Sequence, residues 1–178
     1  MMPHLENEDF TRRSIRARIA WTAFISCGID LVSKTLVIAR LDDHPIRVLG
    51  SLLRLHLAFN SGAAFSLAPS ATYFFSLFSI FIASITWHFS KKIHSRGWAY
   101  IAGLILGGIG GNLLDRIFRT PGFLRGKVVD WIEIPHWPTF NLADTSIFLA
   151  ALFAVILTFR DIPPHPSLKK KGKVGSDE

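Results

Sequence analysis

The chain has 178 residues, 49% of them hydrophobic, and a formal net charge of +7. The apolar residues form long runs separated by short basic stretches, which is typical of a membrane protein and not of a soluble domain. Lys and Arg flank these runs instead of lining one face, so the positive charge does not indicate a nucleic-acid-binding protein. The one cysteine, Cys27, has no partner for a disulfide or a CxxC metal site.

Four windows approach the roughly 20 apolar residues that a helix needs to cross a bilayer. They predict transmembrane helices at residues 19–39, 71–89, 98–118 and 142–159. The first window carries Asp30 and Lys34 and ends without a small-residue cleavage site, so we expect it to remain in the mature protein and not to be a removed signal peptide.

The distribution of basic residues predicts the orientation. Twelve Lys and Arg residues lie in the three segments before the first span, between the second and third, and after the fourth, against seven in the other two segments. The positive-inside rule then places both termini in the cytoplasm. We divide the chain into an N-terminal segment at 1–18, a membrane domain at 19–160 and a basic tail at 161–178. The tail is predicted to be disordered, either as a solvated topology signal or touching anionic headgroups.

Two segments on the outer side alternate with the period of a strand. Leu53, Leu55, Leu57 and Phe59 interleave with polar residues, and residues 128–134 do the same. They predict two short strands that pair into a sheet. The expected fold is an all-α membrane protein with four transmembrane helices and a small extracytoplasmic β-sheet.

Polar residues inside the spans are costly and therefore informative. Asp30 and Lys34 are four apart, so they predict either a structural ion pair or a functional site. Asn112 and Arg116 share a face in the same way, pointing either into a polar cavity or to the membrane interface. Glycines at spacing four indicate a close-packing seam on the third span: Gly103, Gly107 and Gly111.

Two carboxylates near the outer interface each have two interpretations. Asn141 and Asp144 fit a helix capping box, in which the acidic side chain only stabilises the helix start. Asp130 fits a solvent-facing strand position. Their convergence favours chemistry, because two close carboxylates share one proton and so supply both the acid and the base of peptide hydrolysis.

Other site types are less well supported by the sequence. The histidines are scattered and no HExxH occurs, so no zinc site is predicted. Ser61 or Ser66 with Lys34 as base is conceivable, but no GxSxG surrounds either serine. A small proton-coupled carrier is the main alternative function, with an ion path formed by Asp30, Lys34, Asp115 and Arg116.

Four motifs, in order and spacing, resemble those of the lipoprotein signal peptidases (signal peptidase II). They are NSGAAFS at 60–66, GNLLDR at 111–116, VVD at 128–130 and FNLAD at 140–144, preceded by Asp30 and Lys34. The resemblance covers about residues 19–160. Trp131, where the family often has phenylalanine, and a longer segment at 119–125 depart from the pattern.

The resemblance implies a bacterial inner-membrane aspartic endopeptidase without metal or cofactor. Its substrate would be a lipid-modified prolipoprotein embedded among membrane lipids, cut on the amino side of the diacylglyceryl-modified cysteine. Asp130 and Asp144 correspond to the catalytic pair, near the extracytoplasmic face. The resemblance further implies site-shaping roles for Asn60, Gly62, Asn112, Arg116 and Asn141, and supporting roles for Asp30, Lys34 and Asp115.

Overall fold

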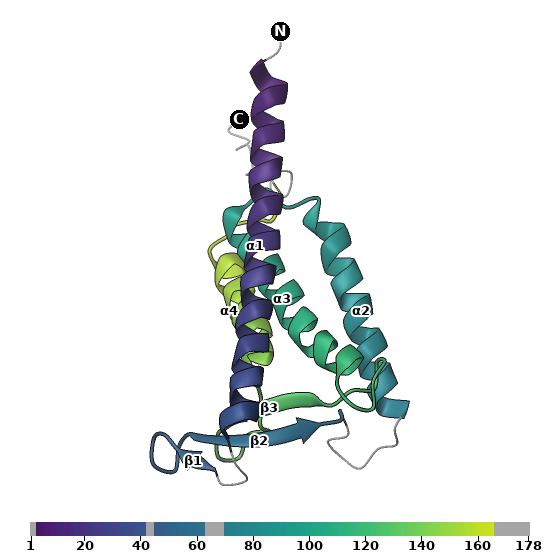
Figure 1. Cartoon of the computed structure of the whole chain (residues 1–178). Coiled ribbons are helices and arrows are strands. Elements are labelled where there is room, and N and C mark those ends of the chain that lie inside the picture. Colours follow the sequence, from purple (N-terminus) through teal and green to yellow (C-terminus); the bar gives the residue numbers. More distant parts are fainter. Residues whose placement is uncertain (1–2, 42–44, 63–69, 166–178) are drawn as a thin grey trace, which may run out of the picture.

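The computed structural model describes residues 3–41, 45–62 and 70–165. Four helices run along one another, and a small sheet lies across the end of the bundle opposite the start of the first helix (Figure 1). The helices are α1 (Pro3–Arg40), α2 (Ser70–Ser90), α3 (Arg96–Phe118) and α4 (Leu142–Phe159). The strands are β1 (Ile46–Arg47), β2 (Arg54–Asn60) and β3 (Val128–Glu133).

All four helices are long and apolar enough to cross a membrane. The candidate spans are Arg13–Arg40, Thr72–Ser90, Arg96–Phe118 and Leu142–Phe159, which confirms the four predicted windows to within a few residues at most ends. At 1.5 Å per residue, α1 is about 57 Å long, well beyond a hydrocarbon core of about 30 Å. The predicted segment 1–18 is therefore largely a continuation of the first helix.

Helix α3 is the centre of the bundle and contacts each of the other three helices. Its glycines allow this, because a Cβ at Gly107 would lie 2.7 Å from the Ala23 carbonyl oxygen of α1, and one at Gly103 would overlap Thr22. The predicted close-packing seam of the third span is confirmed. Apolar side chains of α1 and α3 pack beside it, among them Ile15, Ile19, Ala99 and Ala102.

The sheet has three antiparallel strands in the order β1-β2-β3. Two of them, β2 and β3, are the predicted pair, and β2 places Ala58 opposite Asp130 and Asn60 opposite Val128. The third strand, β1, was not predicted, and it pairs Ile46 with Leu55 of β2. A strand of two residues is too short to show an alternating pattern.

The segment after α4 turns back onto the start of α3. Trp98 Nε1 donates a hydrogen bond to the Ile162 carbonyl at 2.8 Å, and the His94 backbone N–H donates to the Pro164 carbonyl at 2.9 Å. The first residues of the predicted disordered tail are thus hydrogen-bonded to the bundle. The rest of that tail, 166–178, lies outside the described residues.

Candidate active site

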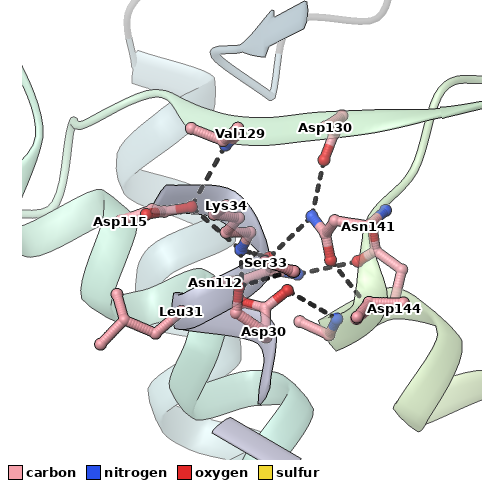
Figure 2. A network of polar contacts seen from close by, with 12 residues as sticks. Asp30, Leu31, Ser33, Lys34, Asn112, Asp115, Val129, Asp130, Asn141 and Asp144 are labelled. Carbon is pink, nitrogen blue, oxygen red and sulfur yellow. Dashed lines mark hydrogen bonds and ion pairs between the residues drawn. The ribbon is translucent and has the colours of Figure 1, made fainter. Parts of the chain in front are cut away.

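A buried lysine organises the polar network where the bundle meets the sheet (Figure 2). Lys34 Nζ lies 2.6 Å from Asp30 Oδ2 and 2.9 Å from Asp115 Oδ2, and the side chains of Lys34 and Asp30 are fully buried. The predicted pair of Asp30 and Lys34 is therefore confirmed, with Asp115 as a second anion. Two carboxylates around one ammonium compensate the cost of burying these charges.

Both carboxylates also receive backbone hydrogen bonds from other elements. Asp30 Oδ1 accepts from the Ala143 N–H of α4 at 2.9 Å, and Asp115 Oδ2 accepts from the Val129 N–H of β3 at 3.1 Å. Asp115 is also paired with Arg119 Nε. Sequence reasoning missed these three partners. The spacing of four between Asp115 and Arg119 could have indicated their pairing, whereas a backbone N–H leaves no signal in the sequence.

Asn112 links the buried Lys34 to the candidate catalytic pair, Asp130 and Asp144. Its Oδ1 accepts hydrogen bonds from Lys34 Nζ at 3.0 Å and from Asn141 Nδ2 at 3.1 Å. Because an ammonium can only donate, the Asn112 oxygen must face Lys34. The amide nitrogen is then turned to Asp144, whose Oδ1 accepts from Asn112 Nδ2 at 2.8 Å. Of the two interpretations of Asn112, the structure supports the polar cavity.

Asn141 is a helix cap and a member of the site at once. Its Oδ1 accepts from the Asp144 N–H at 3.0 Å, and Asp144 Oδ2 accepts from the Asn141 N–H at 3.2 Å, which is the predicted capping box. With its oxygen fixed by the cap, the Asn141 nitrogen reaches Asp130 Oδ1 at 2.6 Å. The cap therefore holds Asp144 and Asp130 on either side of one asparagine.

Asp130 projects from β3 into the network and does not face solvent, which contradicts the alternative of a solvent-facing strand position. Its side chain is 2% exposed, and its Oδ2 accepts from Asn60 Nδ2 at 2.9 Å. Burial raises the pKa of the Asp130 carboxyl from 3.8 to about 6. The hydrogen bond from Asn60 opposes this rise, whereas the neighbouring charge of Asp144 adds to it.

The turn after β2 adds Gly62 and Arg116 beside the aspartates. The Gly62 N–H donates to Asn60 Oδ1 at 2.7 Å, which turns the Asn60 nitrogen to Asp130. Gly62 has φ +82°, and a Cβ there would lie 3.3 Å from Arg116 Nη2, so a glycine suits both the backbone and the space. Arg116 is buried, and its Nη1 has no hydrogen-bond partner within the described part of the chain.

The structure thus brings together all but one of the predicted site residues in one hydrogen-bonded network. Arg116 is the exception, since it lies against Gly62 without a hydrogen bond to the network among the described residues. An apolar pocket of about 460 Å³ adjoins Asp144. Its other lining residues are Ile134, Pro135, Trp137, Phe140, Thr145 and Phe148.

The alternative site types find little support in this geometry. The three donor hydrogens of Lys34 have partners in Asp30, Asp115 and Asn112, which leaves no free base for a serine nucleophile. Ser66 lies outside the described residues. Within the described ranges, no three His, Cys, Asp or Glu side chains are placed to hold a metal ion.

Known proteins are similar to this chain in sequence and in fold. The family model for signal peptidase (SPase) II matches residues 22–160. The lipoprotein signal peptidase of Streptomyces coelicolor is 42% identical over 143 residues, covering 80% of this chain and 70% of that protein. The lipoprotein signal peptidase of Mycobacterium tuberculosis is 38% identical over 137 residues, covering 76% of this chain and 68% of that protein.

Solved structures support the same fold. A bacterial membrane enzyme determined by the in meso method at 1.9 Å resolution superposes with a TM-score of 0.71, covering 80% of this chain and 93% of that chain at 24% identity. A second, at 2.3 Å resolution, gives a TM-score of 0.70 over 88% of this chain and 94% of that chain. The match to the family model spans most of the chain, including every residue of the polar network described above, and the chain therefore belongs to the signal peptidase II family.

Proposed function

We propose that this protein is an aspartic endopeptidase that removes the signal peptide from prolipoproteins, cutting on the amino side of a diacylglyceryl-modified cysteine. The observation that carries the proposal is that two carboxylates, Asp130 and Asp144, lie on either side of Asn141 in a buried polar site. The relatives named lipoprotein signal peptidases support the substrate class. A proton-coupled carrier does not fit a chain that belongs to a peptidase family.

Hydrolysis needs one proton on the pair of carboxylates. Asp130, whose pKa is raised to about 6 by burial, holds that proton and donates it to the carbonyl oxygen of the scissile bond. Asp144 takes a proton from the attacking water. When the tetrahedral intermediate breaks down, the proton on Asp144 passes to the leaving amine, and the diol proton returns to Asp130. The pair then shares one proton again.

The surrounding amides orient the two carboxylates before substrate arrives. Each carboxylate of the dyad accepts from two donors: Asp130 from Asn60 and Asn141, and Asp144 from Asn112 and the Asn141 N–H. These donors restrict rotation of the carboxylates, so little reorganisation is needed in the transition state. Lys34 acts through Asn112 and is a positioning residue.

The position of the site at the end of the membrane spans explains the preference for a lipid-modified substrate. The site lies where the spans meet the sheet, so a lipid-modified cysteine can reach the aspartates while its acyl chains remain in the bilayer. We place this end outside the cytoplasm, with both termini inside, on the distribution of Lys and Arg. The apolar pocket beside Asp144 offers a surface for residues next to the scissile bond.

Cleavage of a purified diacylglyceryl-modified precursor tests the proposal. Asp130→Asn and Asp144→Asn should each lower turnover by about 10² to 10⁴-fold, because an amide cannot exchange the proton. Ser61→Ala is the matched control and should retain activity. If either aspartate variant kept more than about a tenth of wild-type turnover, the assignment of Asp130 and Asp144 as the catalytic pair would be wrong. Equal rates on lipid-modified and unmodified precursor would instead refute the substrate class.

A further inference from the structure

A second apolar cavity lies at the end of the bundle opposite the aspartates. It is a groove of about 640 Å³ between the end of α2 and the start of α3, within the roughly 300–1,000 Å³ range of small-molecule sites. Among its lining residues are Phe89 of α2, Lys92 of the turn, and Trp98, Ile101, Ala102 and Ile105 of α3. None of these residues belongs to the proposed active site.

The groove has a buried floor and one open side. Ile101 and Ala102 are 4% exposed, and Ala102 packs against Ile15 and Ile19 of α1. One end is closed by the segment after α4, which Trp98 and His94 hold by hydrogen bonds to the carbonyls of Ile162 and Pro164. Phe89 is 53% exposed, so its ring lies at the open side of the groove.

The rim of the groove is cationic. Lys92 lines it, and its Nζ lies 5.2 Å from the centroid of the Phe89 ring, which holds the ammonium over the opening. In the turn and the segment after α4, 90–96 and 160–165, the charged side chains are Lys91, Lys92, Arg96, Arg160 and Asp161. Four cations and one anion give this interface a net positive charge.

We propose that this groove binds an anionic phospholipid of the surrounding leaflet, with an acyl chain along Ile101 and Ile105 and the headgroup phosphate at Lys92. Lipid tails in the bilayer are as apolar as the groove, so burying a chain contributes little preference for one lipid over another. The preference must come from the charged rim, where each Lys or Arg near an anionic surface contributes about 1 kcal/mol.

The positive charge at the rim of the groove also disfavours a signal peptide or a second copy of the chain as its occupant. A signal peptide begins with a positively charged segment, which Lys91, Lys92 and Arg96 would repel at this end of the bundle. A second copy of the chain would bring its own cationic rim to the contact. The site is remote from Asp130 and Asp144, so it does not depend on their proposed chemistry.

Native mass spectrometry of the full-length protein tests the proposal, after equilibration with equimolar phosphatidylglycerol and phosphatidylcholine of identical acyl chains. Wild type should retain phosphatidylglycerol preferentially. Lys92→Gln should lower that preference about fivefold, the factor equivalent to about 1 kcal/mol. Arg16→Gln removes an exposed cation near the same interface but outside the groove and should leave the preference unchanged. Ile105→Trp fills the groove and should reduce retention of both lipids.

Equal retention of the two lipids by wild type, or an equal loss in Lys92→Gln and Arg16→Gln, would overturn the proposal. Photo-crosslinking distinguishes the occupant directly. With p-benzoylphenylalanine in place of Phe89, the expected adduct is a phospholipid. An adduct with added precursor polypeptide, or with a second copy of the chain, would overturn it as well. Thermal unfolding of each variant checks that the bundle is intact.

Discussion

Asp130→Asn should abolish cleavage and also remove the loss of stability that ionisation of Asp130 causes as the pH rises. Asp130 is 2% exposed, and burial is the main cause that raises its pKa from 3.8 to about 6. The folded protein thus holds this proton more tightly than the unfolded chain. Its contribution to stability is complete below about pH 4 and is lost as the pH rises through about 6.

The size of this loss follows from the two pKa values. A rise from 3.8 to about 6 corresponds to about 3 kcal/mol, since a tenfold change in proton affinity is about 1.4 kcal/mol. An asparagine cannot ionise, so the variant escapes the loss. Its NH₂ group faces Asn60 or Asn141, which both donate, and cannot accept as a protonated carboxyl still can, so the variant loses one hydrogen bond. This loss is the same at every pH and does not change the pH dependence.

Thermal unfolding in detergent measures the difference. We expect the unfolding temperature of the variant, relative to wild type, to be roughly 6–12 °C higher at about pH 8 than at about pH 4. Asp161→Asn removes an exposed carboxylate and is the matched control, for which the difference should not depend on pH. If the difference between Asp130→Asn and wild type were the same at both pH values, the argument from burial of the Asp130 charge would be refuted.

The remaining predictions concern the network and the topology. Lys34→Met should destabilise the protein by about 3–5 kcal/mol, because two buried carboxylates lose their shared cation; unfolding within 1 kcal/mol of wild type would contradict the ion pairs. Asn141→Ala should cost about 0.5–2 kcal/mol through the lost cap and about 10²-fold in turnover through misplaced carboxylates, so unchanged turnover would rule out its positioning role. In a Cys27→Ser background, Arg47→Cys should react with an impermeant thiol reagent added outside intact cells, and Lys92→Cys should not. The reverse labelling would show that the proposed orientation in the membrane is wrong.

Several parts of the structure follow from local sequence. Hydropathy and length place the four spans because a helix in hydrocarbon must satisfy its own backbone and present apolar side chains over about 20 residues. The capping box of Asn141 and Asp144 could be predicted because its partners are three residues apart. Strands β2 and β3 show period-two alternation, whereas β1 is too short to show any.

The motif resemblance assigns the functional residues, whereas the residues by themselves leave pairs such as Asp30 and Lys34 open between a structural and a chemical role. The sequence does not reveal that Lys34 serves Asp115 as well as Asp30, because residues 34 and 115 meet only when α1 and α3 pack along their glycine seam. Nor does it reveal that the Asn141 cap also reaches Asp130, which depends on where β3 passes the start of α4. Local chemistry determines the helices and their ends, whereas the direction of each polar side chain depends on which donors the tertiary packing brings opposite it.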